Sequence, residues 1–554
     1  MTSWFEAHQD TINGAMEAIH QRGYWSAYAE MPSKRIYGED AAADGQRTFD
    51  AWKGQAFDLP GQPGNGQWIG GEVSPFGPEL GITYPAAEIA DLIAASEAAG
   101  ADWARASAET RVGACLEILH RLNQVSFEMA HAVMHTTGQA FMMAFQAGGP
   151  HAQDRGLEAV AYAYREMRYI PREAAWEKPQ GRHDPLRLTK EYRLLPRGIA
   201  LSIGCATFPT WNSYPGLFAS LATGNPVIVK PHPKAILPLA LTVRIGRDVL
   251  REAGFDPNLL QLAVDEEGAE ITKALVRDPA IRIIDFTGSG EFGAWVRGNA
   301  GAAEIYTEES GVNSIVIDST DDFKGMVRNI CFSLSLYSGQ MCTAPQNLFI
   351  PAGGIDTDLG PMSARAVAEA LAGGLDKLLG DPERALGICG AIQNPATLER
   401  VNSAMAMGEL VRASGPIADA GAARTATPAL IRVEAEQSDV YRREHFGPIA
   451  FVIETADSER AIELAAGLAR EKGAITAAIY SRDEAVLAQA EDAFSAAGAC
   501  LSENLTGGIH VNQSAAFSDY HVTGANPAGN ACLTDAAFVA NRFRVAMIRR
   551  PAAD

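Results

Sequence analysis

The feature that most constrains this fold is an alternation of short β-rich runs with helical segments, which begins after Pro185. Helical periodicity lies between several of these runs, as in Ile236–Ala253 and Gly268–Arg277. Parallel strands need long crossover connections that are usually helices, so the alternation predicts an α/β fold with parallel sheets. The predicted strands are Glu191–Leu195, Ile199–Ile203, Pro226–Lys230, Leu259–Val264, Ile281–Phe286, Ser314–Ile317, Asn347–Ile350, Ile449–Ile453, Ile475–Tyr480, Gly508–Asn512 and Phe543–Ile548.

The part of the chain before Pro185 lacks this alternation of strands and helices. Residues 2–30 suggest a helix followed by turns, and residues 86–168 have helical periodicity almost throughout. Between them, Pro32–Pro85 is dense in glycine and proline, so we expect an irregular arm there. The last predicted strand, Phe543–Ile548, is isolated near the C-terminus, and we expect it to pair with another subunit.

Charge and cysteine usage narrow the classes of function. The net charge of −21 would repel a nucleic-acid backbone or an anionic membrane surface. The seven cysteines are scattered without a CxxC pair, which favours a reducing compartment and gives no sign of a metal site. The N-terminus lacks a signal-peptide pattern, and no apolar run is long enough to span a membrane. We therefore expect a cytoplasmic protein.

The best candidate for a nucleophile is Cys342, in the stretch Tyr337-Ser-Gly-Gln-Met-Cys-Thr-Ala-Pro-Gln346. A thiolate adds readily to an electrophilic carbonyl, and covalent attachment divides one difficult step into two easier ones. Gly339 and Pro345 suggest a bent backbone around it. A single cysteine is more often a small buried apolar residue, so Cys342 needs support from the rest of the chain.

Two segments compete as binding sites for a dinucleotide. Gly288-Ser-Gly-Glu-Phe-Gly293 follows a predicted strand and has the GxGxxG spacing that brings backbone amides and a helix N-terminus to a pyrophosphate. In that interpretation Glu308 or Glu309 would hold the ribose hydroxyls. The second segment, Asn225-Pro-Val-Ile-Val-Lys-Pro231, delivers Lys230 to the end of a strand, where open α/β sheets bind ligands. A solvated lysine closing a strand is the simpler explanation of Lys230 alone.

Two loops carry groups that suit acyl chemistry. Asn212, in Ala206-Thr-Phe-Pro-Thr-Trp-Asn-Ser-Tyr-Pro215, has an amide that can donate to a developing oxyanion, although loop asparagines usually serve turns. Glu308, in Glu308-Glu-Ser-Gly-Val-Asn313, is either a general base or a solvated acid.

The order of these motifs resembles the aldehyde dehydrogenase superfamily, from about Ser74 to the C-terminus. The matching segments are Trp211-Asn212, Val229-Lys230-Pro231, Phe286-Thr-Gly-Ser289, Glu308-Glu-Ser-Gly311, Gly339-Gln-Met-Cys342 and Glu444-His-Phe-Gly-Pro448. The resemblance implies that Cys342 is the nucleophile, Asn212 an oxyanion donor and Glu308 the general base. It implies binding of NADP or NAD by the following residues: Trp211, Lys230, His232, Gly288, Ser289, Gly293, Glu444 and Phe446.

The resemblance also implies a division of the chain. We expect an arm and helix over residues 1–85, a cofactor-binding domain over 86–307 with oligomerisation strands near 186–198, and a catalytic domain over 308–512. Residues 513–554 would form a C-terminal return with an oligomerisation strand. Such enzymes assemble, so a homodimer or homotetramer is expected.

Departures from the family pattern affect the cofactor and the substrate. The family often has Lys-Pro-x-Glu, whose glutamate holds the adenosine ribose, whereas this chain has Lys230-Pro-His-Pro233. With no carboxylate to repel a 2′-phosphate and His232 nearby, NADP is at least as plausible as NAD. Glu308-Glu-Ser-Gly311 replaces Glu-Leu-Gly-Gly, and Asn212-Ser-Tyr-Pro215 replaces Asn-Phe-Pro, so the environment of the base and the tunnel wall differ.

Within the superfamily, Gly23-Tyr-Trp25, Ser33-Lys-Arg-Ile-Tyr-Gly38 and Thr207-Phe-Pro-Thr-Trp-Asn212 resemble the phenylacetate-degradation (PaaN-type) semialdehyde dehydrogenases. This implies oxidation of a CoA-linked semialdehyde to an acid, through a thiohemiacetal and a thioester on Cys342. The chain ends just past its terminal strand, so any ring-opening hydrolase would be a separate protein. The alternatives are a CoA-acylating dehydrogenase, a cysteine thioester hydrolase on the same fold, and a non-catalytic structural protein.

Overall fold

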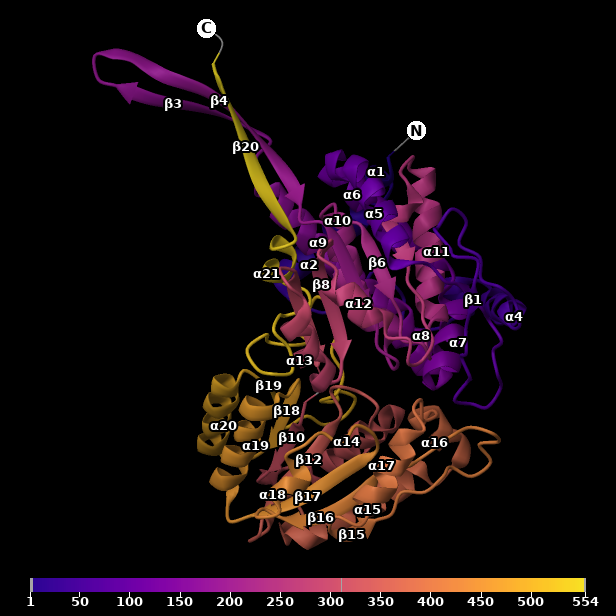
Figure 1. Cartoon of the computed structure of the whole chain (residues 1–554). Coiled ribbons are helices and arrows are strands. Elements are labelled where there is room, and N and C mark those ends of the chain that lie inside the picture. Colours follow the sequence, from indigo (N-terminus) through magenta and orange to yellow (C-terminus); the bar gives the residue numbers. More distant parts are fainter. Residues whose placement is uncertain (1–2, 310, 553–554) are drawn as a thin grey trace.

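The computed structural model describes residues 3–309 and 311–552, and it has two lobes, each built on a mainly parallel sheet (Figure 1). The expected α/β fold is confirmed. Ser310, which belongs to the motif Glu308–Gly311, lies outside the described residues. Among the residues described, no helix has both the length and the apolarity needed to cross a bilayer.

The first lobe contains a five-stranded sheet in the order β7-β6-β5-β8-β9, and all its strand pairs are parallel. Its strands are β5 (Ile199–Ile203), β6 (Val227–Lys230), β7 (Leu260–Leu262), β8 (Ile281–Gly288) and β9 (Glu304–Glu309). Alternate residues face opposite sides: Val229 packs in one cluster with the helices α6, α9, α10 and α11, whereas Ile228 packs in another with α5, α12 and α13. Because both faces are covered, the inner strands β5 and β6 are mainly apolar.

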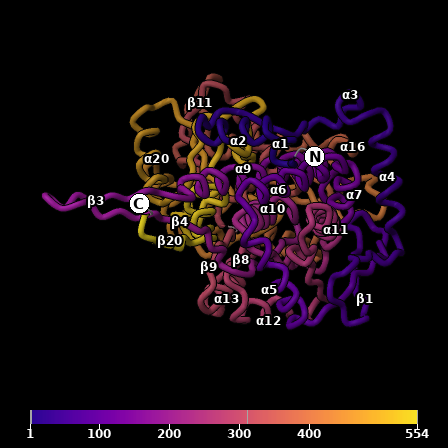
Figure 2. Tube along the Cα trace, turned by 90° about the horizontal axis from the view of Figure 1, so that it is seen from above, coloured from indigo at the N-terminus to yellow at the C-terminus, as the bar shows by residue number. Residues whose placement is uncertain are grey.

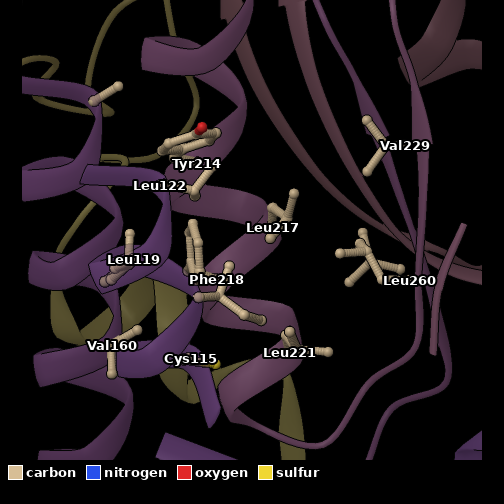
Figure 3. Packing of buried hydrophobic residues seen from close by; sticks show 14 of the residues in the cluster. Cys115, Leu119, Leu122, Val160, Tyr214, Leu217, Phe218, Leu221, Val229 and Leu260 are labelled. Carbon is tan, nitrogen blue, oxygen red and sulfur yellow. The ribbon is translucent and has the colours of Figure 1, made fainter. Parts of the chain in front are cut away.

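Figure 3 shows the interior of the first face. Side chains of α6 and α10, among them Leu119, Leu217 and Leu221, pack toward Val229 and Leu260 on the sheet. The helices of this lobe are α1 (Trp4–Ala7), α2 (Gln9–Gln21), α3 (Lys34–Tyr37), α4 (Ala41–Trp52), α5 (Ile89–Arg105), α6 (Ala108–Gln124), α7 (Ser126–Thr137), α8 (Phe141–Gly148), α9 (Pro150–Arg168), α10 (Pro209–Ala222), α11 (Leu237–Glu252), α12 (Ile271–Arg277), α13 (Gly290–Asn299) and α21 (Ala536–Ala540), with the 3-10 helix η1 (Pro257–Leu259).

The second lobe contains a seven-stranded sheet in the order β15-β16-β17-β12-β10-β18-β19, parallel except for β15 against β16. Its strands are β10 (Asn313–Ile317), β12 (Pro345–Pro351), β15 (Glu409–Arg412), β16 (Ala429–Glu434), β17 (Ile449–Thr455), β18 (Thr476–Tyr480) and β19 (Cys500–Glu503). Its helices are α14 (Phe323–Ser335), α15 (Ala364–Leu379), α16 (Pro382–Cys389), α17 (Ala396–Ala404), α18 (Ser438–Tyr441), α19 (Ser458–Lys472) and α20 (Glu484–Ala497), with the 3-10 helix η2 (Leu336–Gly339).

An antiparallel three-stranded sheet projects from the first lobe (Figures 1 and 2). It consists of β3 (Glu173–Gln180), β4 (His183–Pro196) and β20 (Phe543–Pro551). The predicted C-terminal strand is therefore present, but its partner is β4 of the same chain, from Phe543 opposite Pro196 to Pro551 opposite Leu188. The register puts Leu186, Val545 and Met547 on one face of this projecting sheet, and all three are exposed by more than 40%. Short strands complete the list: β1 (Trp68–Ile69), β2 (Tyr84–Pro85), β11 (Ser319–Thr320), β13 (Ile355–Thr357) and β14 (Gly360–Met362).

Three sequence predictions about local structure are wrong. The segment of Asn212 is not a loop, because helix α10 begins at Pro209. The supposedly irregular arm contains helix α4, whose buried Phe49 stacks on His135 of α7 with ring centroids 4.9 Å apart. Gly508–Asn512 is a loop, and β19 forms the edge of the sheet in its place. The Asn512 side chain donates to Ser333 O, and the Asn512 carbonyl accepts from Thr343 Oγ1, so partners far away in the sequence hold this loop.

Candidate active site

The Cys342 loop has an unusual backbone. Tyr337, Ser338 and Gly339 have φ of 51°, 50° and 61°, and non-glycine residues adopt such values only where their surroundings enforce them. Here the surroundings do so: Tyr337 Oη donates to Thr137 O at 2.5 Å, and Ser338 Oγ is 2.9 Å from Ala426 O. At Gly339 a Cβ would lie 2.5 Å from Gly447 O, so the close approach requires glycine.

The strand behind the loop fixes the nucleophile itself. Asn313, at the start of β10, donates from Nδ2 to Cys342 O at 2.8 Å and to Ala344 O at 2.9 Å. Its Oδ1 accepts from the backbone amides of Ile475 and Thr476 at 2.9 and 3.1 Å. One amide side chain thus ties the Cys342 loop to β18.

The thiol, a carboxylate and an imidazole meet at this point. Cys342 Sγ lies 3.5 Å from Glu308 Oε1 and 4.0 Å from His521 Nε2. Glu308 Oε1 is 2.9 Å from His521 Nε2, and Glu308 Oε2 accepts from Asn212 Nδ2 at 2.8 Å. The end of β9, the start of α10, the Cys342 loop and the C-terminal return therefore converge on one small volume.

The surroundings shift the pKa values of Glu308 and Cys342 in opposite directions. Burial would raise the pKa of Glu308, but the charge of His521 and hydrogen bonds from His521, Cys342 and Asn212 outweigh it and lower that pKa below its ordinary value. Burial first, and then the negative charge of Glu308, raise the pKa of Cys342 well above the usual range. In this arrangement Glu308 is ionised and Cys342 is a thiol.

Two cavities meet at Cys342. One, of about 610 Å³, runs along the carboxyl ends of the strands in the first lobe, and the other, of about 900 Å³, lies between α8, α14 and the return segment. Phe208, Asn212 and Cys342 line both. A molecule in either cavity would reach the same sulfur.

The first cavity contains most of the residues predicted to bind the dinucleotide. These are Lys230, His232, Gly288, Ser289, Glu444 and Phe446. Gly288 ends β8 and Ser289 caps α13, so helix amides point toward the cavity, as a pyrophosphate requires. A strand edge, a helix N-terminus and a cation fit an adenine dinucleotide.

The structure does not bring Trp211 or Gly293 to that cavity. Trp211 lines the second cavity, where its ring packs edge-on against His521 with centroids 4.5 Å apart. Gly293 lies inside α13 beneath Glu309, and a Cβ there would meet the Glu309 carboxylate at 2.1 Å. Glu309 in turn pairs with Arg297.

A carboxylate that the sequence did not reveal lies beside Lys230. Asp265, in the loop after β7, has its Oδ1 2.6 Å from Lys230 Nζ, and both side chains are buried. The premise that no acid stands near Lys230 is therefore wrong. In the sequence, only the residues that follow Lys230 indicate its surroundings, whereas Asp265 comes from the loop after the neighbouring strand β7.

Comparison with known proteins agrees with this geometry. The model of the aldehyde dehydrogenase family matches residues 76–527. This chain belongs to the aldehyde dehydrogenase family. A crystal structure of an NAD-dependent aldehyde dehydrogenase from Burkholderia multivorans is 53% identical, covers 100% of both chains and has a TM-score of 0.98.

More distant relatives of this aldehyde dehydrogenase differ in their named substrates. An N-succinylglutamate 5-semialdehyde dehydrogenase of Burkholderia multivorans is 26% identical over 396 residues, which cover 69% of this chain and 74% of that protein. A 1-pyrroline-5-carboxylate dehydrogenase from Thermus with bound NAD is 20% identical, with a TM-score of 0.72 and coverage of 96% and 99%. At that identity the likeness extends to the fold alone.

Sequence reasoning missed three residues of the site in this aldehyde dehydrogenase: Asn313, Asp265 and His521. Asn313 was visible only as the last residue of the Glu308 segment, and a strand-initiating asparagine gives no signal of its own. His521 lies in a stretch without periodicity between Glu503 and Ala536. A histidine between Tyr520 and Val522 has many structural explanations, and only the fold brings it to Cys342.

Proposed function

We propose that this enzyme oxidises an aldehyde to a carboxylic acid with NAD as the hydride acceptor. The observation that carries the proposal is the Cys342 thiol, 3.5 Å from Glu308, at the junction of the two cavities. The smaller cavity suits the dinucleotide and the larger one the aldehyde.

The protein groups divide the reaction between them. The Cys342 thiol passes its proton to Glu308 Oε1, 3.5 Å away, which relays it to solvent, and the sulfur adds to the aldehyde carbon, while the Asn212 amide donates to the resulting oxyanion. The bound nicotinamide supplies the hydride acceptor. Glu308 then removes a proton from water, which attacks the thioester and releases the acid. Asn212 Nδ2 carries two N–H donors, so it can hold Glu308 Oε2 with one of them and donate to the oxyanion with the other.

Two observations support a preference for NAD: the position of Asp265 beside Lys230, and the similarity of this chain to an NAD-dependent protein. A carboxylate 2.6 Å from Lys230 neutralises the cation that a 2′-phosphate would need and adds repulsion of its own. The Burkholderia protein that is 53% identical to this chain is described as NAD-dependent. Among the sequence alternatives we therefore favour NAD over NADP.

The substrate prediction from the sequence, a CoA-linked semialdehyde of phenylacetate breakdown, is retained as a proposal. The larger cavity has room for a long chain, and Met142, Met143, Met341 and Phe332 contribute to its walls. Its described lining holds three carboxylates, of Glu30, Asp154 and Asp519, but neither lysine nor arginine. A CoA-linked substrate would therefore place its uncharged pantetheine arm inside and keep its phosphates outside.

The decisive experiment is a panel of free and CoA-linked aldehydes with NAD or NADP, followed by absorbance of the reduced nicotinamide. We expect reduction that needs no free CoA and disappears in Cys342→Ala, while Cys500→Ser, a half-exposed cysteine on β19, retains it. Nicotinamide reduction by Cys342→Ala would refute the mechanism. Dependence on free CoA would instead indicate an acylating dehydrogenase, and acyl-CoA hydrolysis without a dinucleotide would indicate a hydrolase.

A further inference from the structure

His521 occupies a position that the mechanism above does not use. Its side chain is 4% exposed, and its Nε2 lies 2.9 Å from Glu308 Oε1 and 4.0 Å from Cys342 Sγ. Its ring rests edge-on against Trp211. A buried imidazole in contact with both reacting protein groups is placed to influence either of them.

A chain of hydrogen bonds fixes the orientation and tautomer of this ring. Arg155 Nη2, which can only donate, donates to Ser514 Oγ at 3.0 Å. The Ser514 hydroxyl is thereby free to donate to His521 Nδ1, 3.1 Å away. In the neutral ring the proton is then on Nε2, which donates to Glu308 Oε1; this tautomer is assigned from the network. Arg155 itself is held by an ion pair with Glu158 at 3.0 Å.

The ionisable side chains around the Glu308 carboxylate come from several different elements of the fold. Cys342 and His521 contact it directly, Cys205 lies close enough to interact electrostatically, and Glu444 acts on Cys342 from the cofactor side. Behind His521, Arg155 and Glu158 of α9 form a pair, and the Arg155 guanidinium lies 5.1 Å above the Trp211 ring. Among the side chains that contact Glu308 directly, His521 is the one that can carry a positive charge.

We propose that His521 is a positioning residue for Glu308, holding the carboxylate between Cys342 and Asn212 and keeping it ionised inside a closed site. The proposal rests on Glu308 as the base of the proposed function. Without the imidazole, burial of Glu308 is opposed only by the Asn212 amide and the thiol. Glu308 then takes up a proton at a higher pH, and as the pH falls the enzyme loses its base sooner.

The test uses a readout that needs neither NAD nor an aldehyde. p-Nitrophenyl acetate acylates a reactive thiol directly, so the burst of nitrophenol reports acylation of Cys342 and the steady rate reports hydrolysis of the thioester. In His521→Gln we expect a retained burst and an acidic limb of the steady rate moved upward by about one pH unit, which is about a tenfold lower rate on that limb. At high pH the rates of the variant and the wild type converge.

Two further variants test whether the shift of the acidic limb comes from His521: one perturbs its hydrogen-bond partner, and the other is a control. Ser514→Ala removes the hydroxyl that holds His521 Nδ1, and we expect a smaller shift in the same direction. His8→Gln changes an imidazole that lines neither cavity and lies 2.8 Å from Glu117 Oε2, and we expect an unchanged acidic limb. Thermal melting of each variant reports whether it folds, and Ser514→Ala carries the test if His521→Gln does not.

The outcomes separate this proposal from the proposed function. Superimposable acidic limbs for the wild type and a folded His521→Gln would overturn the role of His521, and so would an equal shift in His8→Gln. Ester hydrolysis with the predicted shift, together with no aldehyde oxidation by the wild type, would leave the role of His521 standing and remove the proposed function.

Discussion

At the scale of single residues, Glu308 makes the resting Cys342 thiol less reactive and yet serves as the base in the proposed reaction. Its carboxylate raises the pKa of the thiol by charge, and it is also the group that later activates water in the proposed reaction. The resting enzyme therefore protects its sulfur from adventitious alkylation and oxidation, because the thiolate is the reactive form.

Replacement of Glu308 by Gln should make Cys342 more reactive although it stops turnover. The negative charge disappears while burial remains, so the pKa of the thiol falls, and more of it is ionised at a given neutral pH. We expect iodoacetamide to modify Cys342 at pH 7.5 about tenfold faster, since removing an adjacent charge shifts a pKa by about one unit or more. Glu309→Gln is the matched control, because that neighbouring carboxylate pairs with Arg297 and not with the thiol. Equal alkylation rates for Glu308→Gln and the wild type would contradict this account.

Asp265 gives a second prediction for a single residue. In Asp265→Asn, the repulsion of a 2′-phosphate disappears, and we expect the ratio of kcat/KM for NADP to that for NAD to rise about tenfold, as about 1.4 kcal/mol of repulsion would give. Glu267→Gln, an exposed acid that pairs with Lys234, should leave the ratio unchanged. A ratio that stays constant in Asp265→Asn would assign cofactor choice to another part of the cavity.

At the scale of elements, the sequence predicted regular structure well and irregular structure poorly. The strands Ile199–Ile203 and Ile281–Phe286 are short, mainly apolar runs rich in isoleucine and bounded by turns, so their pattern alone identifies β5 and most of β8. Gly508–Asn512 has a similar composition, but its polar groups bond to α14 and to the Cys342 loop. Such long-range partners leave no periodic trace in the sequence.

The candidate site shows the same division. Cys342, Glu308 and Asn212 stand in recognisable motifs at the ends of regular elements, and the structure brings them together. Asp265 and His521 come from loops whose position depends on the whole fold. Their contributions to the site are therefore apparent only in the folded structure.

The turn before Cys342 provides a test at this scale. Gly339→Ala would place a Cβ 2.5 Å from Gly447 O in a left-handed backbone, and the loop would have to shift. Because a displacement of about 1 Å can cost about 100-fold in rate, we expect kcat to fall by about that factor with little change in the KM for NAD. Gly353→Ala, at an open position without left-handed φ, is the control. Wild-type kcat in a folded Gly339→Ala would show that the turn does not position the sulfur.

At the scale of the whole molecule, the projecting sheet of β3, β4 and β20 has little contact with its own lobe (Figures 1 and 2). It exposes Leu186, Val545 and Met547 on one face, an apolar surface that a monomer would leave in water. This supports the sequence-based proposal of a homo-oligomer assembled through these strands.

The double variant Val545→Asp, Met547→Asp should weaken that assembly, because two carboxylates would have to be buried without partners. We expect light scattering after size exclusion to report the 59.0 kDa monomer for the variant and a multiple of that mass for the wild type. Leu359→Asp, at an exposed position outside the projecting sheet, should leave the mass of the wild type unchanged. A wild type that elutes as a monomer would remove the proposal.

The cofactor cavity and the substrate cavity meet at the Cys342 sulfur but open separately, and this has a kinetic consequence. The spent coenzyme can depart without passing the acyl group, and the acid can depart without passing the coenzyme. Accumulating acid should therefore depress the maximal velocity with respect to NAD without being outcompeted by it, so that even an abundance of coenzyme would not relieve inhibition by the product.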